Sequence, residues 1–444
     1  RPLARHLRSA LHPRASIVAS AAIVAAVSVG CSRGPGEGAA GDAPEAQPGS
    51  GASGVSGLGR PTPVPVPAGA GSGQPHLALG PGGQAVLSWL EPTGERGQAL
   101  KFSRFEAGDW SAPEEVAAGE NLLVNWADFP SVEPITADTW IAHWLRMAPD
   151  SFASYDVSYS VSRDGGQTWS EPALLNDDGY LTEHGFVSLF PWGDAIGAVW
   201  LDGRRIAEQF EQGEFDPEAP PVGMSLRYAR IGYDGAVRER GELDELACDC
   251  CQTDAAVAAD GPVVVYRDRT PAEIRDNVVL RYADGAWQPA VTLGPDGWHI
   301  EGCPVNGPAV AARGDDVVAA WFTAPGNAPK TRFARSTDGG ATFGPPVEID
   351  GAGSFGHVDV ALLQDGGAAV SWWRRAEAGR TQLAARRIEP DGTLGEIVTV
   401  ASNAAAQPVD VPQMIETGGE LLFAWTDAAQ NTVRTASVSL SPPR

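Results

Sequence analysis

Short apolar strands recur along the chain from residue 74 onward. Each unit begins with apolar residues that alternate with polar ones, passes through a turn rich in Gly and Asp, and ends in a second apolar run closed by an aromatic residue. Alternation with a period of two over such short runs predicts half-buried β-strands joined as hairpins. The units cover residues 77–89, 132–144, 187–200, 255–266, 309–321, 358–372 and 411–425.

The spacing of these units predicts the architecture. Successive closing aromatics are roughly 50 to 65 residues apart, a period typical of the blades of a β-propeller. A further pair of strands follows each unit, around a Gly- or Asp-containing turn. Four strands in each of seven units account for the body of the chain, so we expect an all-β fold.

Two units carry nearly the same turn inside this second strand pair. Residues 162–169 read Ser-Arg-Asp-Gly-Gly-Gln-Thr-Trp, and residues 336–343 read Ser-Thr-Asp-Gly-Gly-Ala-Thr-Phe. A short Asp side chain accepts hydrogen bonds from the N–H groups of its own turn, the glycines permit positive φ, and the aromatic pins the turn against a sheet. The structural residues are Ser162, Asp164, Gly166 and Trp169 in the first copy, and Ser336, Asp338, Gly340 and Phe343 in the second.

The pattern Ser-x-Asp-x-Gly-x-Thr-(Trp/Phe) resembles the Asp box, the repeat of bacterial neuraminidases and other sialidase-type β-propellers. The resemblance implies a propeller of four-stranded antiparallel blades over residues 74–440. Seven units favour seven blades, whereas the sialidases have six, so six blades is the alternative. In that family the Asp box lies away from the catalytic centre, so it indicates the fold and not the activity.

The segment before the repeats has a different composition. Residues 32–73 are rich in Gly, Pro, Ala and Ser, which predicts a disordered linker. Within it, every second residue of 61–67 is Pro, so the missing N–H donors of an extended chain would all lie on one edge. This segment could therefore supply the fourth strand that the last unit lacks and close the ring; a polyproline II spacer is the alternative.

The first 31 residues predict export. Arginines at the start, an apolar run over residues 17–29 and then Gly30-Cys31 follow the order of a signal peptide. Residues 28–31 resemble a lipobox, with Ser28 where an aliphatic residue is usual, and Cys31 would be the lipidated residue. We expect an exported protein that is lipid-anchored to a membrane, periplasmic or at the cell surface; ordinary secretion and an uncleaved anchor are the alternatives.

The charge narrows the classes of partner. The chain has 32 Lys and Arg against 56 Asp and Glu, a net charge of -24. A chain this acidic is repelled by nucleic acid, so we expect no nucleic-acid partner, and contact with a membrane through the lipid anchor only. A glycan or another anionic small ligand is the expected partner, with an envelope protein as a further candidate, and we expect no cofactor.

Chain connectivity separates two faces of a propeller. The segments that lead into each first strand and leave each second strand share the face opposite the Asp boxes. Arginines recur on this face at corresponding points of several repeats, and converging guanidinium groups would bind a carboxylate. The candidate ligand-binding residues are Arg204, Arg267, Arg269 and Arg374, and the alternative for each is an ion pair with a neighbouring acid.

The resemblance to sialidases implies a set of catalytic groups on the same face. In that family an arginine cluster holds the substrate carboxylate, a Tyr activated by Glu attacks, and an Asp acts as acid/base. The candidates by position are Asp128, Asp202 and Asp268 as acid/base, Glu183 or Glu301 as base or tyrosine partner, and Tyr180 as nucleophile. The Arg-Ile-Pro signature of the family is absent, which leaves sialidase activity open.

Four cysteines remain beside Cys31. They are Cys248, Cys250, Cys251 and Cys303, an even number in an exported chain, so two disulfides are expected. A bridge between Cys251 and Cys303 would join adjacent units and would leave Cys248 with Cys250 as a tight pair. A soft-metal site that also uses His299, and a redox-active pair, are the alternatives, although our main expectation includes no metal.

These observations support hypotheses from different classes. The first is a sialidase-like propeller that binds or hydrolyses glycans at the cell envelope. The second is a non-catalytic scaffold or binding propeller, suggested by the absent catalytic signature. The third is a metal-dependent protein centred on the cysteines.

Overall fold

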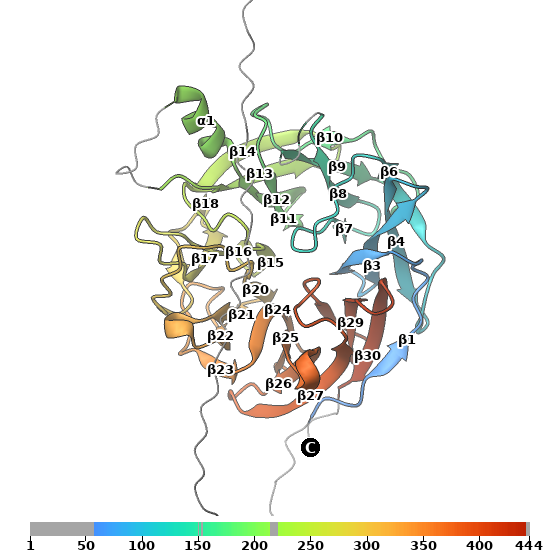
Figure 1. Ribbon diagram of the computed structural model, residues 1–444, viewed down its shortest axis with the longest axis vertical. Helices are drawn as coiled ribbons and strands as arrows, with labels where there is room; N and C mark the ends of the chain where they lie inside the picture. The colour runs from blue at the N-terminus through green and yellow to red at the C-terminus, as the bar shows by residue number, and fades with distance from the viewer. Residues whose placement is uncertain (1–56, 150, 152–153, 214–220, 441–444) are drawn as a thin grey trace, which may run out of the picture. The chain divides into compact units, whose positions relative to one another are not determined.

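The computed structural model describes residues 57–149, 151, 154–213 and 221–440, and these residues form seven antiparallel sheets around a central axis (Figure 1). The all-β fold and the preferred count of seven blades are therefore confirmed, against the alternative of six. The expected signal peptide, Cys31 and residues 32–56 of the expected linker lie outside the described residues.

Each blade is a sheet whose first strand lies nearest the axis. Blade 1 contains β2 (Gly73–Leu79), β3 (Ala85–Thr93), β4 (Gly97–Glu106), β5 (Asp109–Trp110) and β6 (Glu114–Gly119); blade 2 contains β7 (Ser131–Pro134), β8 (Trp140–Met147), β9 (Tyr155–Ser162) and β10 (Ala173–Leu174). Blade 3 contains β11 (His184–Trp192), β12 (Ala195–Asp202), β13 (Ser225–Gly232) and β14 (Val237–Asp244); blade 4 contains β15 (Asp254–Val257), β16 (Pro262–Arg267), β17 (Asn277–Ala283), β18 (Ala286–Trp287) and β19 (Val291–Thr292). Blade 5 contains β20 (Ala309–Arg313), β21 (Asp316–Thr323), β22 (Lys330–Ser336) and β23 (Val347–Asp350); blade 6 contains β24 (Ser354–Leu362), β25 (Ala368–Arg375), β26 (Thr381–Ile388) and β27 (Leu394–Asn403). Blade 7 contains β28 (Gln413–Thr417), β29 (Glu420–Asp427), β30 (Thr432–Ser439) and β1 (Thr62–Val64).

The ring is closed by a strand from the N-terminal side of the chain. Strand β1 pairs antiparallel with β30, with Pro63 opposite Ala436, and becomes the outermost strand of blade 7. Of the two interpretations of the Pro-alternating segment, the structure shows the edge strand, where a missing N–H costs nothing on the solvent side. The propeller begins before the expected boundary at residue 74, because Gly71 also donates to the carbonyl of Asn431.

Three short helices interrupt the strands. They are α1 (Arg204–Gln212) after the second strand of blade 3, η1 (Pro325–Asn327) in blade 5 and η2 (Glu377–Gly379) in blade 6. Among the described residues, none of the helices has the length and apolar character needed to cross a membrane.

The buried cores lie between neighbouring blades, and the aromatic residues that close the second strands fill them. Trp89, Trp200, Trp321 and Trp372 are among the largest fully buried side chains. Burial of one such side chain stabilises the fold by roughly 1.5–3 kcal/mol or more, provided that the indole N–H finds an acceptor.

The indole N–H of each of these four tryptophans donates to a carboxylate, which in turn pairs with a cation. The sets are Trp89–Glu91–Lys101, Trp200–Asp202–Arg204, Trp321–Asp296–Arg332 and Trp372–Asp350–Arg374. We call this arrangement the aromatic–carboxylate–cation unit. It appears in blades 1, 3, 5 and 6. The cation lies at the end of the second strand in blades 3 and 6 (Arg204 and Arg374) and on the third strand in blades 1 and 5 (Lys101 and Arg332).

The two Asp boxes have the same internal hydrogen bonds. In the first, the Thr168 hydroxyl and N–H donate to Asp164 at 2.6 and 2.9 Å, and the N–H of Gly166 donates to Ser162 at 2.8 Å. In the second, the hydroxyl and N–H of Thr342 donate to Asp338 at 2.6 and 2.9 Å, and the N–H of Gly340 donates to Ser336 at 2.9 Å. The four glycines of the two boxes have φ values between 67° and 89°, which no L-residue adopts readily.

Candidate functional site

The structure places the Asp boxes and the site candidates on opposite faces. The N–H of Gly165 donates to Asp138 in the turn between β7 and β8, and the N–H of Gly339 donates to Asp315 in the turn between β20 and β21. The boxes therefore share a face with the turns between first and second strands. We call the other face, made by the segments that lead into first strands and leave second strands, the loop-rich face.

An axial channel of about 410 Å³ runs between the first strands of the seven blades. Its lining includes Glu133, Asp254 and Asp359. Burial raises the pKa values of all three, and the charge of Asp254 raises those of Glu133 and Asp359 further. The Asp254 carboxylate accepts the N–H of Val310 at 2.7 Å, and that of Asp359 accepts the N–H of Met414 at 2.6 Å. These acids tie the first strand of one blade to that of the next.

The expected arginine cluster does not form. Arg204 binds both oxygens of Asp202 at 2.8 Å, and Arg374 lies 3.2 Å from a carboxylate oxygen of Asp350. Both belong to aromatic–carboxylate–cation units of different blades. Their recurrence along the sequence therefore reflects the repeated packing of the blades, and ion pairing is the correct interpretation for these two residues.

The other two arginines are also held within the protein. Arg269 pairs with Asp249 at 2.8 Å and with Glu273 at 2.7 Å. Arg267 is 1 % exposed, and its guanidinium donates to the carbonyl oxygens of Asn306, Arg275 and Phe322 at 2.7–2.8 Å. The guanidinium groups of Arg204, Arg267 and Arg269 are thus engaged within the protein, whereas Arg374 contacts Asp350 through Nε.

Asp202 is fully buried and does not act as an accessible acid/base. Next to it, His184 donates through Nδ1 to the carbonyl of Tyr155 at 3.1 Å and through Nε2 to Asp178 at 2.9 Å. Burial lowers the pKa of His184, but the hydrogen bond that it donates to Asp178 and the charges of Asp178 and Asp202 outweigh burial and raise the pKa. Ligand atoms of Asp178, His184 and Asp202 lie within 4.8 Å of one another, yet a doubly protonated imidazole is not a metal ligand.

Asp128 is sealed inside the loop-rich face. It is 2 % exposed, its Oδ1 accepts the N–H of Phe186 at 2.7 Å, and an added Cβ on Gly185 would lie 1.9 Å from its Oδ2. Burial and the nearby charge of Glu183 raise the pKa of Asp128 to about 8, although the Phe186 N–H opposes the shift. In this conformation Asp128 is a neutral acid that no solvent reaches.

Glu183 lies directly before β11 and is not sealed as Asp128 is. It is half-buried, and its carboxyl has neither a hydrogen-bond nor an ion-pair partner within the described part of the chain. Burial and the charge of Asp249 raise the pKa of Glu183, against the opposing charge of His184. Asp249, which the sequence did not single out, therefore lies close enough to act on Glu183.

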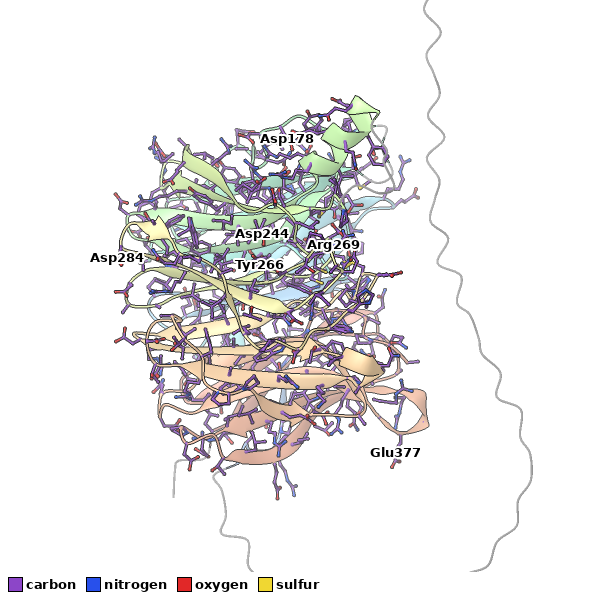
Figure 2. The ribbon with its side chains drawn as sticks, turned by 90° about the vertical axis from the view of Figure 1, so that its left-hand side faces the viewer. Asp178, Asp244, Tyr266, Arg269, Asp284 and Glu377 are labelled. Carbon is purple, nitrogen blue, oxygen red and sulfur yellow. A yellow bond between two sulfur atoms is a disulfide. The ribbon has the colours of Figure 1, made fainter. Side chains whose placement is uncertain are left out.

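The remaining catalytic candidates lie elsewhere. Asp268 is near Asp244, which accepts the Tyr266 hydroxyl, and burial together with the Asp244 charge raises the pKa of Asp268 to about 6. Figure 2 shows Asp244, Tyr266 and Arg269 in the same region of the molecule. Tyr180 is half-exposed, and its pKa is raised by burial and by the charges of Glu208 and Glu211 on α1. The structure therefore does not bring Tyr180 together with an arginine cluster.

Trp126 was missed as a binding candidate. Its side chain is 37 % exposed and packs edge-to-face on His357, with ring centroids 5.4 Å apart. The backbone that follows it is held by the Gln252 side chain, which donates to the carbonyl of Ala127 at 2.7 Å. Large aromatic side chains are usually buried, so an exposed one in a loop of fixed geometry indicates a binding surface.

The cysteines form one disulfide where two were expected. Cys250 and Cys303 are bonded and join the loops of blades 4 and 5, while Cys248 and Cys251 are buried thiols. A bridge between adjacent units is thus present, but it uses Cys250 and not Cys251. The reason is orientation: Cys251 points inward, whereas Cys250 lies nearer the surface, where it reaches the exposed Cys303.

No protein-family model and no curated protein matches the chain. Solved structures do match along most of its length. A protein of unknown function from Dyadobacter fermentans is 14 % identical, with 87 % of this chain and 100 % of that chain covered and a TM-score of 0.46. An alpha-L-arabinanase of Penicillium chrysogenum in complex with arabinobiose is 12 % identical, with 88 % and 99 % covered and a TM-score of 0.46. A mutant of the NanB sialidase of Streptococcus pneumoniae is 10 % identical, with 86 % and 94 % covered and a TM-score of 0.43. At these identities the similarity concerns the fold.

Proposed function

We propose that the protein binds neutral glycans on its loop-rich face and hydrolyses them with Glu183 as the acid/base group. The observation that carries the proposal is the half-buried, unpartnered Glu183 carboxyl with a raised pKa, close to the charge of Asp249. Glycoside hydrolysis ordinarily uses two carboxyl groups whose environments separate their pKa values. Asp249 is the second group, since it is hydrogen-bonded to Arg269 and to the N–H of Met224 at 2.8 Å.

Trp126 supplies the surface on which a sugar ring stacks. It precedes Asp128 by two residues in the loop that reaches Phe186, so the same loop that carries Trp126 contacts the strand next to Glu183. Exposed aromatic rings bury the apolar face of a sugar, while polar groups around them fix its orientation. Neutral sugars are favoured over acidic ones because Arg204, Arg267 and Arg269 are held within the protein.

Hydrolysis is tested on neutral and sialylated oligosaccharides with the wild type, Glu183→Gln and Glu301→Gln. Glu301 is an exposed carboxylate in the loop of blade 5 and serves as the matched control. We expect turnover of a neutral substrate, a loss of about 100-fold or more in Glu183→Gln, and no change in Glu301→Gln. Because the pKa of Glu183 is raised, the activity should persist above the usual range of a Glu and fall as pH rises through that pKa.

Binding is tested separately by calorimetry with the same oligosaccharides. Trp126→Ala should lose binding, whereas Phe210→Ala should keep it, because Phe210 is a 79 % exposed aromatic on α1 whose loss removes only surface. The proposal would be overturned if the protein neither bound nor hydrolysed any of these glycans.

A non-catalytic sugar-binding or scaffold protein of the cell envelope is the second candidate. It is favoured by the sealed position of Asp128, which leaves that carboxyl out of reach of a ligand. Glycan binding that depends on Trp126 together with no turnover in the wild type would select this candidate.

We further propose that the chain is exported and anchored through Cys31. The support is the order of basic, apolar and small residues in the first 31 positions. A Cys31→Ser variant should move from the membrane fraction to the soluble exported fraction of the cell.

A further inference from the structure

Four cysteines gather where the loop before β15 meets the loop before β20. Cys250 and Cys303 form a disulfide with Cα atoms 6.2 Å apart, and Cys248 and Cys251 are free thiols. The sulfur atoms of Cys248, Cys250 and Cys251 all lie within 4.8 Å of one another. A buried dithiol therefore lies directly beside one sulfur of a disulfide.

The surroundings of Cys248 favour its thiolate. Arg275 donates to the sulfur of Cys248 at 3.4 Å, and Cys251 forms a hydrogen bond with it. Burial raises the pKa of Cys248, but these hydrogen bonds and the charges of Arg267 and Arg275 outweigh burial and bring the pKa down to about 7. The thiolate is the form that attacks a disulfide.

Arg267 provides an independent argument for an anion at this position. Its guanidinium is buried and bound to three carbonyl oxygens, and within the described residues it has no carboxylate partner. A buried cation is costly without a compensating charge. The Cys248 thiolate, on which the Arg267 charge acts, supplies this charge.

Solvent access differs across the four sulfur atoms. Cys248 and Cys251 are 0 % and 1 % exposed, Cys250 is half-buried, and Cys303 is exposed. The attacking thiol is thus hidden from solvent, while the sulfur that would leave lies at the surface of the loop-rich face.

We propose that these cysteines form a thiol–disulfide exchange centre in which Cys248 displaces Cys303 from Cys250 and presents a free Cys303 thiol at the surface. A bond forms between the sulfurs of Cys248 and Cys250, and the bond between Cys250 and Cys303 breaks. The electron pair goes to the sulfur of Cys303, which takes up one proton from solvent, while Cys248 has released one proton on forming the thiolate. The rearrangement therefore needs neither an oxidant nor a reductant.

Cys251 extends the relay by one step. Its thiol is hydrogen-bonded to Cys248, and burial keeps its pKa well above the usual value for Cys. Once it loses its proton to solvent, it attacks Cys248 and releases Cys250, which is protonated in turn. The disulfide has then moved from the surface pair to the buried pair, and the loops of blades 4 and 5 are no longer bonded to each other.

The proposal is tested by alkylating the native full chain, purified without reductant, with N-ethylmaleimide at pH 7, and then locating the label by peptide mapping. We expect label on Cys303 at least 10-fold faster in the wild type than in Cys248→Ser. Cys251→Ser is the matched control, because it removes an equally buried thiol without blocking the first exchange, so it should still label Cys303. A wild type without label on Cys303, or equal labelling in Cys248→Ser, would overturn the proposal.

Arg275→Gln provides a second measurement that does not depend on the stability of Cys248→Ser. Loss of the Arg275 charge and hydrogen bond raises the pKa of Cys248, so labelling of Cys303 at pH 7 should fall several-fold and recover to the wild-type rate at pH 9. Unchanged labelling at pH 7 in a folded Arg275→Gln protein would contradict the exchange mechanism.

Discussion

At two junctions between blades, a side-chain oxygen before one blade accepts a backbone N–H from the first strand of the next blade. The accepting group is a carboxyl at one junction and an amide at the other. At the junction of blades 2 and 3, Asp128 lies three residues before β7 and accepts the N–H of Phe186 at 2.7 Å. At the junction of blades 5 and 6, Asn306 lies three residues before β20 and accepts the N–H of His357 at 2.7 Å. The two donor residues, Phe186 and His357, have φ values of 54° and 52° in irregular first strands, and each junction follows a blade with an Asp box.

The difference between the junctions shows which one is structural. The side-chain oxygen and nitrogen of Asn306 both have hydrogen-bond partners. The oxygen accepts the N–H of His357, and the nitrogen donates to the carbonyls of Pro304 and Phe355 at 3.2 Å. Asp128 is made neutral by its raised pKa, and its carboxyl is hydrogen-bonded to the N–H of Phe186 and to the Tyr155 side chain. The junction of blades 2 and 3 also carries Trp126 and Glu183. The hydrogen bond shared by the two junctions is therefore structural, and the features found only at the junction of blades 2 and 3 mark the candidate site.

The largest expected effect comes from Arg267 of blade 4, which binds the carbonyl oxygens of Asn306 and Phe322 in blade 5 and so supports the Asn306 junction. Arg267→Met leaves three carbonyl groups without their donor, including that of Asn306, and should lower the free energy of unfolding by roughly 3–5 kcal/mol. Arg374→Met, at a partly exposed ion pair, should lower it by about 0–1 kcal/mol. Urea unfolding of both variants measures the difference, and equal losses would contradict the assignment of Arg267 as a buried support.

Next in size are the glycines that make room for the acceptors. A Cβ on Gly185 would lie 1.9 Å from Asp128, and one on Gly356 would lie 2.2 Å from Asn306. We expect each Gly→Ala change to cost about 1–3 kcal/mol, with more at Gly356 because its φ is 71°. Gly297→Ala, at positive φ in open space, isolates the backbone cost. If Gly297→Ala and Gly356→Ala lowered the free energy of unfolding by the same amount in urea, the close approach to Asn306 would not be the cause of the loss at Gly356.

Much of the fold could be predicted from the sequence because its signals are local. The alternation of apolar residues, the closing aromatics and the Asp boxes each depend on residues a few positions apart, and each is present in the structure. The closing strand β1 was also readable, because alternate prolines leave one edge of a strand free to pair.

The site was less predictable because its contacts join distant segments. The sequence shows that Arg204 and Arg374 recur, but not that Asp202 and Asp350 bind them beneath Trp200 and Trp372. Two of the four carboxylates in the aromatic–carboxylate–cation units, Asp296 and Asp350, come from segments before the second strand of the blade they serve. Which Cys meets Cys303 likewise depends on the orientation of a loop and not on spacing.

Replacing each acceptor by the other residue type should have unequal effects on stability. Asp128→Asn should change stability by less than about 1 kcal/mol at pH 5, because the protonated Asp already acts as a neutral acceptor. Asn306→Asp should cost about 1–3 kcal/mol, since it removes the two hydrogen bonds that the amide nitrogen donates. Chemical denaturation at pH 5 measures both, and a larger loss in Asp128→Asn than in Asn306→Asp would contradict the role of Asp128 as a neutral acceptor.

The same pair gives a pH dependence with a defined sign. The pKa of Asp128 is raised from 3.8 to about 8 on folding. Its contribution to the stability of the folded state is therefore full below about pH 4 and is lost as pH rises toward 8. Asp128→Asn removes this loss, and the variant should therefore gain stability relative to the wild type between pH 5 and pH 8.

The smallest effect is expected at the Asp boxes, where the two copies have the same geometry. Hydrogen bonds from the Thr168 and Thr342 side chains, with others from their own turns, lower the pKa values of Asp164 and Asp338 from 3.8 to about 2. Their contribution is therefore present above about pH 4 and is lost as pH falls through 2. Asp164→Asn and Asp338→Asn should each lower the melting temperature slightly and equally at pH 7, and the difference from the wild type should disappear near pH 2. Asp284→Asn, in a hairpin turn without Ser and Thr partners (Figure 2), is the control, and unequal shifts in the two box variants would show that the blades around them set the stability of the turns.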